Sequence, residues 1–308
     1  MSEPDSIESH LSEERTFDPP GWIQTDALIP SMEKYQKMYD ASVDNPDTFW
    51  GNIAEEFDWY QRWIRVDGSD LNTAHISWFE GASTNLSHNC LDRHIIAGHG
   101  DDSAITWEGD DGEVRTFTFS EVLSRVCQMA NALRTHDVQR GDRVTIYMPM
   151  IPELAFALLA CARIGAIHSV VFAGFSAESL SQRIIDGESD IVMTADAGLR
   201  GGRRIELKSI ADDAATLAAA AGIDVRRMFV SHRAGDGVGP GTSGWVEGRD
   251  IDLAACMSEQ DEVCEPEQMG SEDPLFILYT SGSTGKPKGL LHTLAGYMVF
   301  AATTCKSN

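Results

Sequence analysis

The sequence predicts an α/β fold in which a mostly parallel sheet is flanked by helices and preceded by a helical N-terminal extension. Two observations lead to this prediction. From about residue 81 onward, short apolar runs alternate with segments of helical period, as in strand–helix–strand crossover units. Before that point, aromatic residues recur at helical spacing. We expect a main domain over residues 81–308, behind an extension over residues 31–80 and a flexible arm over residues 1–30.

The N-terminal part contains several residues that end helices. Prolines at positions 19, 20 and 30 break the arm. The aromatic residues that follow Ser31 indicate two helices, separated near residues 44–46, where the sequence reads Asp-Asn-Pro. We expect this aromatic stripe to pack against a larger body, and we assign it no chemistry.

The expected elements of the main domain follow in chain order. Strands over residues 104–108 and 114–118 enclose a Gly-Asp-Asp-Gly turn, and Ser120 then caps a helix whose apolar positions recur up to residue 133. The glycine-rich stretch 234–244 predicts a flexible loop and an internal boundary. The remaining strands are expected at 143–148, 166–172, 191–195, 227–230 and 275–280, and the remaining helices at 152–164, 176–185, 209–221 and 292–304.

An apolar strand that ends at Thr280 leads into a loop of glycine, hydroxyl and lysine residues. Its glycines let backbone amides approach an oxyanion closely. Two of the chain's six lysines fall here, which favours an anionic ligand over a solvated Gly-Ser turn. The loop is not a Walker A motif, because only two residues separate Gly282 from Gly285 and Pro287 follows the first lysine. The predicted phosphate-binding residues are Thr280, Ser281, Gly282, Ser283, Thr284, Gly285, Lys286, Lys288 and Gly289.

The segment from Tyr279 to Gly289 resembles the signature loop of the adenylate-forming superfamily, which includes acyl-CoA synthetases and luciferases. A longer co-linear resemblance, from about Tyr60 to Thr304, is to the acetyl-CoA synthetases in particular. The helical N-terminal extension also resembles that of the acetate and propionate enzymes. The segments that carry the resemblance are Trp78-Phe-Glu-Gly-Ala, Asn89-Cys-Leu-Asp-Arg-His94, Ile146-Tyr-Met-Pro-Met150, Ala160-Cys-Ala-Arg-Ile-Gly-Ala166 and Phe276–Leu291.

The resemblance implies an AMP-forming acetate–CoA ligase. In such an enzyme acetate attacks the α-phosphorus of ATP, bound with Mg²⁺, to give acetyl-adenylate and diphosphate. The thiol of coenzyme A (CoA) then attacks the acyl carbon and AMP leaves. The implied small-molecule partners are therefore acetate, ATP with Mg²⁺ and CoA. The loop at 280–289 would hold the β- and γ-phosphates and stabilise the departing diphosphate.

A second basic cluster follows the expected strand at 191–195. The carboxyl end of a parallel strand is a favoured ligand position, and glycines at 201 and 202 would let Arg200 and Arg203 converge on one phosphate. By spacing alone, the cluster also fits a basic surface loop paired with neighbouring acids. The resemblance implies that Arg200 and Arg203 contact the nucleotide phosphates of CoA, and we expect Arg204 to face solvent.

A third segment, Phe172-Ala-Gly-Phe175, ends a strand and opens a helix. The resemblance implies that it borders the adenine of CoA. The alternative is a strand-to-helix turn that packs phenylalanine into the core. Together with the basic cluster, the CoA-binding residues that the resemblance implies are Phe172, Ala173, Gly174, Arg200, Gly201, Gly202 and Arg203.

Other polar residues are expected to be structural. We interpret His94, His168 and His292 as buried or capping histidines, and we expect Asp92 and Arg93 to form a local ion pair. The six cysteines lack the spacing of a zinc site or a disulfide scaffold. Those at 127 and 161 lie within helix-like apolar patterns and are expected to be buried free thiols.

The sequence ends less than halfway through the length of a typical member of the resembled family, and Cys305–Asn308 no longer resembles it. By comparison, we expect the segments for adenine, ribose and magnesium binding, the acetate pocket and the C-terminal domain to be absent from these residues. We therefore assign no catalytic residue and no metal ligand. Two other hypotheses remain open. One is a non-catalytic remnant or binding module, and the other is one half of a split acyl-CoA ligase, for propionate or another short acyl group, completed by a companion polypeptide.

The chain is strongly acidic, with 48 Asp and Glu against 24 Lys and Arg and a net charge of −24. This balance argues against duplex nucleic acid as a partner, and the 42% hydrophobic content argues against a disordered acidic chain. No stretch approaches the ~20 apolar residues of a membrane span, and the N-terminus lacks the features of a secretory signal. We expect a cytoplasmic protein of a salt-accumulating (halophilic) organism.

Folding is therefore expected to require salt. Repulsion among the acidic side chains is screened in molar KCl, where the Debye length is about 3 Å, and acts over about 30 Å at 0.01 M. The circular-dichroism signal of the folded chain should collapse when KCl is lowered from molar to tens of millimolar. A chain that stays fully folded at low KCl would contradict this expectation.

Overall fold

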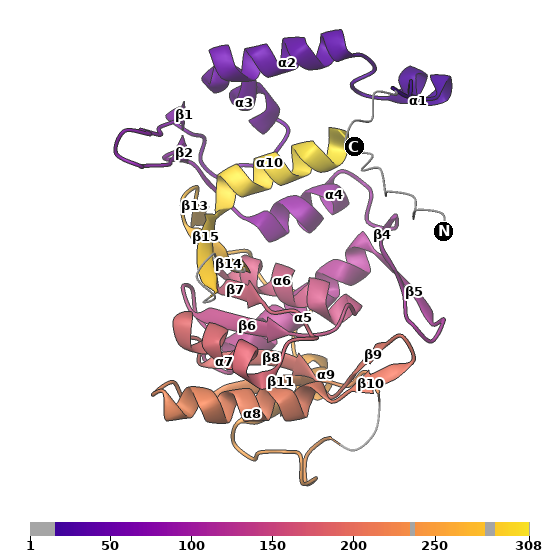
Figure 1. The fold of residues 1–308 in the computed structure, drawn as a ribbon, viewed down its shortest axis with the longest axis vertical. Helices are drawn as coiled ribbons and strands as arrows, with labels where there is room; N and C mark the ends of the chain where they lie inside the picture. The colour runs from indigo at the N-terminus through magenta and orange to yellow at the C-terminus, as the bar shows by residue number, and fades with distance from the viewer. Residues whose placement is uncertain (1–15, 235–237, 281–286, 308) are drawn as a thin grey trace, which may run out of the picture.

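The computed structural model describes residues 16–234, 238–280 and 287–307, and a seven-stranded sheet forms its centre (Figure 1). The strand order is β12-β11-β8-β6-β7-β14-β15, and every neighbouring pair is parallel except β14 with β15. The predicted fold class, a mostly parallel sheet flanked by helices, is confirmed. The strands are β6 Arg143–Tyr147, β7 Ile167–Val170, β8 Ile191–Ala195, β11 Arg227–Ser231, β12 Asp250–Asp252, β14 Pro274–Thr280 and β15 Lys288–Thr293.

Helices cover both faces of this sheet because alternate side chains of each buried strand point to opposite sides. In β6, Val144 and Ile146 point into a core formed with α5, α6 and α9. Tyr147 points into the opposite core, formed with α7 and α8 (Figure 1). The bounds are α5 Phe119–Thr135, α6 Pro152–Ile164, α7 Ala177–Asp186, α8 Leu207–Ala220 and α9 Leu253–Ser258.

Local sequence signals explain where most of these helices begin and end. Helix α7 follows Ser176, whose side chain accepts a hydrogen bond from the backbone N–H of Ser179. Helix α6 starts with a proline and ends at Gly165, which has φ 73°. Helix α5 begins earlier than expected. Thr118 rather than Ser120 is its N-cap, because Thr118 and Glu121 form a reciprocal capping box.

The N-terminal extension contains the two helices predicted from the aromatic spacing, α2 Met32–Asp44 and α3 Pro46–Ala54. Asn45 separates them and caps α3. The expectation that the whole aromatic stripe packs against the body is wrong for α2. None of its residues is buried, and Tyr35 and Tyr39 stack on each other instead, with ring centroids 6.2 Å apart.

The extension is not wholly helical, and the arm is not wholly irregular. A short helix, α1 Gly21–Asp26, lies within the described part of the arm. Strands β1 Arg65–Asp67 and β2 Trp78–Glu80 form an antiparallel pair inside the expected helical segment. The other short elements are β3 Ser83–Thr84, a π-helix at His88–Asp92, α4 Arg93–Ile96, β4 Ser103–Glu108, β5 Val114–Thr118, β9 Gly198–Arg200, β10 Arg203–Ile205 and β13 Met269–Gly270.

The last described helix, α10 Leu294–Ser307, packs on the N-terminal extension (Figure 1). A helix was expected from residue 292, but residues 288–293 instead form β15, an antiparallel edge strand of the sheet. Leu294 and Val299 of α10 share an apolar core with Ala54 and Phe79 of the extension. The two ends of the described chain are therefore joined by one core. None of the helices in the described part of the chain is long and apolar enough to cross a membrane.

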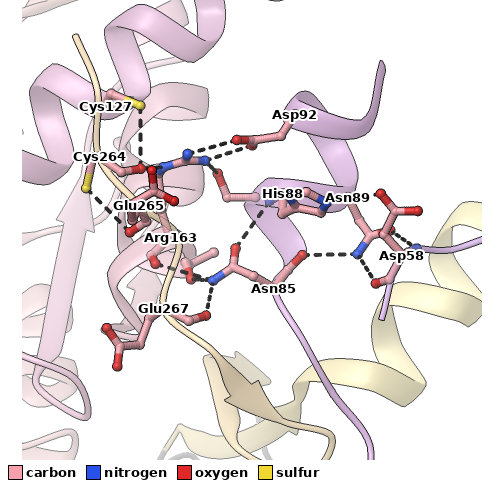
Figure 2. Close-up of polar contacts among 12 residues, drawn as sticks. Asp58, Asn85, His88, Asn89, Asp92, Cys127, Arg163, Cys264, Glu265 and Glu267 are labelled. Atoms are coloured by element: carbon pink, nitrogen blue, oxygen red, sulfur yellow. Dashed lines mark hydrogen bonds and ion pairs between the residues drawn. The ribbon is translucent and has the colours of Figure 1, made fainter. Parts of the chain in front are cut away.

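A buried polar network joins residues 85–92, which follow the extension, to the end of α6 and to the segment before β14 (Figure 2). Arg163, at the end of α6, donates two hydrogen bonds of 2.8 and 2.9 Å to the carboxylate of Asp92, and its side chain is only 4% exposed. It also donates to the carbonyl of Cys264, which lies on the segment leading to β14. Burial lowers the pKa of the Arg163 guanidinium, but Asp92 outweighs that effect, so the pKa is raised.

Asn85 extends the same network. Its amide nitrogen donates to the carbonyls of Ala162 and Glu267, at 3.0 and 2.9 Å, so one side chain joins the segment after β3 to both α6 and the segment before β14 (Figure 2). The expected local ion pair between Asp92 and Arg93 is not formed. Arg93 turns the other way and donates to the carbonyl of Glu56, because Arg163 already occupies both oxygens of Asp92.

Two cysteines are buried free thiols, as their helix-like apolar surroundings predicted. Cys127 and Cys161 are buried and free, 2% and 0% exposed. Burial raises the pKa of the Cys161 thiol to about 12. Both thiols therefore behave as small apolar side chains.

Removing Arg163 should destabilise the chain far more than removing an exposed arginine. Arg163→Met leaves the carboxylate of Asp92 without its partner, and we expect the free energy of unfolding in urea to fall by about 3–5 kcal/mol. The matched control is Arg62→Met, which breaks an exposed pair with Glu55 and should cost less than about 1 kcal/mol.

Adding Asp92→Asn to Arg163→Met should recover part of the loss, because no unpaired charge then remains buried. If Arg163→Met and Arg62→Met lowered the free energy of unfolding equally in molar KCl, the network would not be what holds these segments together.

Candidate functional site

The structure contains a cavity of about 520 Å³ at one edge of the sheet. Segments that follow β6 and β7 line it, and so do the β4–β5 and β9–β10 hairpins. Because the carboxyl ends of parallel strands meet at one edge of a sheet, this is a favoured place for a ligand. The residues that line the cavity include Trp107, Asp110, Phe172, Arg200, Arg233 and Leu278.

The predicted basic cluster forms the β9–β10 hairpin. Gly201 and Gly202 make its two-residue turn with φ values of 56° and 71°, a conformation that favours glycine at both positions. Arg200 and Arg203 are directly opposite each other across the pair. Side chains that are opposite in an antiparallel pair lie on the same face, so the turn brings both arginines to one side.

Arg204 is opposite Leu199 and therefore belongs to the other face of the hairpin. Its guanidinium lies against the carboxylate of Glu206. Within the described residues, neither Arg200 nor Arg203 forms an ion pair with an acid, so the two arginines on the first face are the ones available to an anion.

The segment Phe172-Ala-Gly lies beside this hairpin, as the resemblance implies for a shared site. The Arg200 guanidinium is 5.1 Å from the centre of the Phe172 ring. Phe172 is 52% exposed, so the alternative in which its ring packs into the core is wrong. Gly174 is required beside it, because a Cβ there would lie 2.5 Å from the Phe172 ring. Ala173, between them, also lines the cavity.

The opposite wall of the cavity, which the sequence did not predict, is the β4–β5 hairpin. The indole N–H of Trp107 donates to the carbonyl of Met150 at 2.6 Å, and the guanidinium groups of Arg115 and Arg233 lie 4.5 and 5.1 Å from the Trp107 ring centre. Such contacts between cations and an aromatic ring are attractive. The sequence predicted the two strands and the turn of this hairpin but not its place at the cavity, because nothing in the spacing places residue 107 near residue 200.

The turn of this hairpin is acidic and held from one side. Arg233 donates to Asp111 at 2.6 Å and to Glu113 at 3.4 Å. The hydrogen bond from Arg233 is the main reason why the pKa of Asp111 is below its usual value. Asp110 points elsewhere: its carboxylate accepts a hydrogen bond of 2.7 Å from the backbone N–H of Gly201. The two hairpins therefore meet at this contact.

The predicted phosphate-binding segment lies partly outside the described residues, which omit Ser281, Gly282, Ser283, Thr284, Gly285 and Lys286. Its two ends are described. Thr280 ends β14 and is opposite Lys288 at the start of β15, with Gly289 opposite Tyr279. A Cβ at Gly289 would lie 3.1 Å from the side chains of Ile277 and Tyr279, so a larger residue there would need those side chains to shift.

Strand β14 is fixed next to the cavity. It pairs in parallel with β7, so Thr280 and Val170 end neighbouring strands at the same edge of the sheet. Leu278 of β14 lines the cavity. The Tyr279 hydroxyl donates to Asp186 of α7 at 2.8 Å, and its pKa is raised by burial and by that carboxylate. The predicted phosphate segment and the predicted CoA segments are therefore neighbours.

The three histidines that were interpreted as structural pack against aromatic rings. His168 is buried and stacks on Phe276, and burial lowers the pKa of its imidazole to about 4. His292 stacks on the same ring at 4.4 Å. His94 lies 5.0 Å from Phe119. Among the described residues, no group of three or more His, Cys, Asp or Glu could hold a metal ion.

Comparison with known proteins identifies the class. Residues 92–308 match the family model of the AMP-binding enzymes. This match covers more than half of the chain, and the chain belongs to that family. Residues 35–90 match the model of the acetyl-coenzyme A synthetase N-terminus, so the chain corresponds to an N-terminal portion of that kind of protein. The resemblance predicted from the sequence is confirmed.

Individual relatives agree with this assignment. The chain is 49% identical to an acetyl-coenzyme A synthetase of Mesorhizobium japonicum over 291 residues, and 48% identical to one of Syntrophus aciditrophicus over 283 residues. These matches cover 92% and 91% of this chain but only 43% and 41% of the relatives. A solved structure, the acetoacetyl-CoA synthetase from Streptomyces lividans, is similar with a TM-score of 0.77 at 26% identity, covering 91% of this chain and 41% of that one. The chain thus spans less than half the length of these relatives.

Proposed function

We propose that the chain supplies the CoA site and part of the ATP-phosphate site of an AMP-forming acetate–CoA ligase. The observation that carries this proposal is the contact of Arg200 with the exposed ring of Phe172 at an open cavity. A planar adenine stacks on aromatic rings and guanidinium groups, and a phosphate is bound well by forked arginine donors. The names of the relatives supply the reaction, the conversion of acetate, ATP and CoA to acetyl-CoA, AMP and diphosphate.

The positions of the described strand ends support separate sites for the two half-reactions. The segment after β14 would hold the β- and γ-phosphates of ATP, bound with Mg²⁺, and stabilise the charge of the departing diphosphate. Lys288, exposed at the start of β15, would contribute to this charge stabilisation. The cavity beside it would hold CoA for the second half-reaction, in which the thiol attacks the acyl carbon.

We also propose that the protein works in a cytoplasm of high ionic strength. ATP and CoA are cytoplasmic substrates, and a net charge of −24 repels itself unless salt screens it. The basic hairpin and Lys288 at the start of β15 supply positive charge to the proposed site within an otherwise acidic chain.

The CoA assignment predicts that removing an arginine weakens CoA binding on one face of the β9–β10 hairpin and not on the other. Arg200→Ala and Arg203→Ala should each weaken CoA binding to the 308-residue chain by about 10- to 100-fold, because each removes one charge-assisted contact worth ~1.5–3 kcal/mol. Arg204→Ala is the matched control, with the same loss of charge on the opposite face, and should change the affinity by less than threefold.

Isothermal titration in molar KCl with CoA and dephospho-CoA measures both effects. We expect the wild-type chain to prefer CoA over dephospho-CoA, and Arg200→Ala and Arg203→Ala to lose that preference. Equal affinity of the wild-type chain for the two ligands would refute the assignment of a phosphate to these arginines.

The ligase assignment predicts acetate-dependent exchange of labelled diphosphate into ATP when the chain is combined with a polypeptide that covers the remaining length of a relative. Lys288→Ala should slow the exchange by about 10-fold or more, because one charged contact to the leaving diphosphate is lost. Lys306→Ala is the control, since that lysine pairs with Glu56 at the end of α10 and does not lie at the ends of β14 and β15. Exchange that does not depend on acetate, or equal rates in both variants, would count against the ligase.

A further inference from the structure

The contact between Asp110 and Gly201 joins the two hairpins that flank the cavity. The Asp110 carboxylate accepts the Gly201 N–H at 2.7 Å, although the two residues are 91 positions apart. Gly201 is the first residue of the turn between Arg200 and Arg203, which share one face of the hairpin. Asp110 and Arg200 both line the cavity. The hydrogen bond therefore lies at the cavity, beside the two arginines that are available to an anion.

The carboxylate occupies a position suited to a phosphate oxygen. A backbone N–H flanked by two arginines is a donor set that binds anionic oxygens, and a carboxylate and a phosphate compete for the same donor. Asp110 uses the N–H alone, because within the described residues it makes no ion pair with Arg200 or Arg203. When a ligand phosphate approaches those arginines, the Gly201 N–H is already hydrogen-bonded to Asp110, and the negative charge of that carboxylate repels the phosphate.

The rest of the acidic turn is held in place independently of Asp110. Arg233 holds Asp111 and Glu113, and backbone hydrogen bonds of 2.8 and 2.9 Å close the turn from Gly109 to Glu113 and from Gly112 to Gly109. The turn is therefore a fixed support from which a single carboxylate reaches the neighbouring hairpin. Asp110 is exposed, so releasing it into water carries little desolvation cost.

We propose that Asp110 is a latch that holds the β9–β10 hairpin against the β4–β5 turn in the free protein and is displaced by the phosphate of the incoming ligand. The proposal rests on the proposed function, since the ligand is taken to be CoA or another nucleotide with a terminal phosphate. Asp110 thereby determines specificity: a ligand gains the Gly201 N–H only if its own anion replaces the carboxylate. With a ligand that has no phosphate at that position, the hydrogen bond between Gly201 and Asp110 stays formed.

The test uses the full 308-residue chain in molar KCl and two readouts. Asp110→Ala should speed hydrogen exchange of the backbone amides at residues 198–205 in the absence of ligand by about three- to tenfold, because one hydrogen bond to a charged acceptor is lost. The same variant should bind CoA about three- to tenfold more tightly than the wild type, with a smaller gain for dephospho-CoA. Asp110→Asn keeps an acceptor without the charge. Its hydrogen-exchange rates and its CoA affinity should therefore lie between those of the wild type and those of Asp110→Ala.

Asp213→Ala is the matched control, because it removes one exposed carboxylate from α8, outside the cavity lining, and should alter neither readout. Unchanged exchange of the hairpin in Asp110→Ala, or weaker CoA binding, would overturn the latch. If no variant binds CoA while the hairpin exchanges faster in Asp110→Ala, the proposed function and the competition with ligand both fail, and the contact between the hairpins is confirmed. The two failures are therefore distinguishable.

Discussion

The buried ion pair between Arg163 and Asp92 is the interaction on which the placement of the other parts depends. It lies where the π-helix after the extension, the end of α6 and the segment before β14 meet (Figure 2). Two charges removed from water gain little net stability over apolar residues of the same size, so its main effect is to define one arrangement. Because Arg163 satisfies Asp92 and the Cys264 carbonyl together, a shift of any one of these segments leaves a buried polar group unpaired.

That constraint reaches the candidate site through β14. The segment around Cys264 and Glu267 leads through β13 into β14, and β14 is also tied to α7 by Tyr279. The strand is therefore fixed at both of its ends, and it ends with Thr280 at the edge of the sheet where the cavity lies. A site for transfer between two large ligands needs such positioning, since orientation can contribute about 7–11 kcal/mol to a reaction step.

The sequence predicted best those features that depend on local pattern. The strands of the parallel sheet follow from short apolar runs, and the β9–β10 turn follows from two adjacent glycines between arginines. Features that depend on distant pairing were missed. Nothing local distinguishes β15 from the start of a helix, because its Lys-Gly-Leu-Leu-His-Thr pattern becomes a strand only when β14 pairs with it. The Trp107 wall and the partner of Asp92 likewise require contacts across 43 and 71 positions.

In a chain this acidic, a proposed site for anionic ligands needs local compensation of the surrounding negative charge. With 48 acidic residues, some carboxylates inevitably lie near any cavity, and four of the six residues from Glu108 to Glu113 are acidic. In this structure Arg233 neutralises two of them, and the backbone of the basic hairpin occupies a third. Arg200 and Arg203, on the face of that hairpin away from Arg204, are thereby left without an ion pair to an acid among the described residues. Salt screens the remaining exposed charges over a few ångströms, but it does not screen a direct hydrogen bond at 2.7 Å, so the contact between Asp110 and Gly201 persists where the diffuse repulsion is lost.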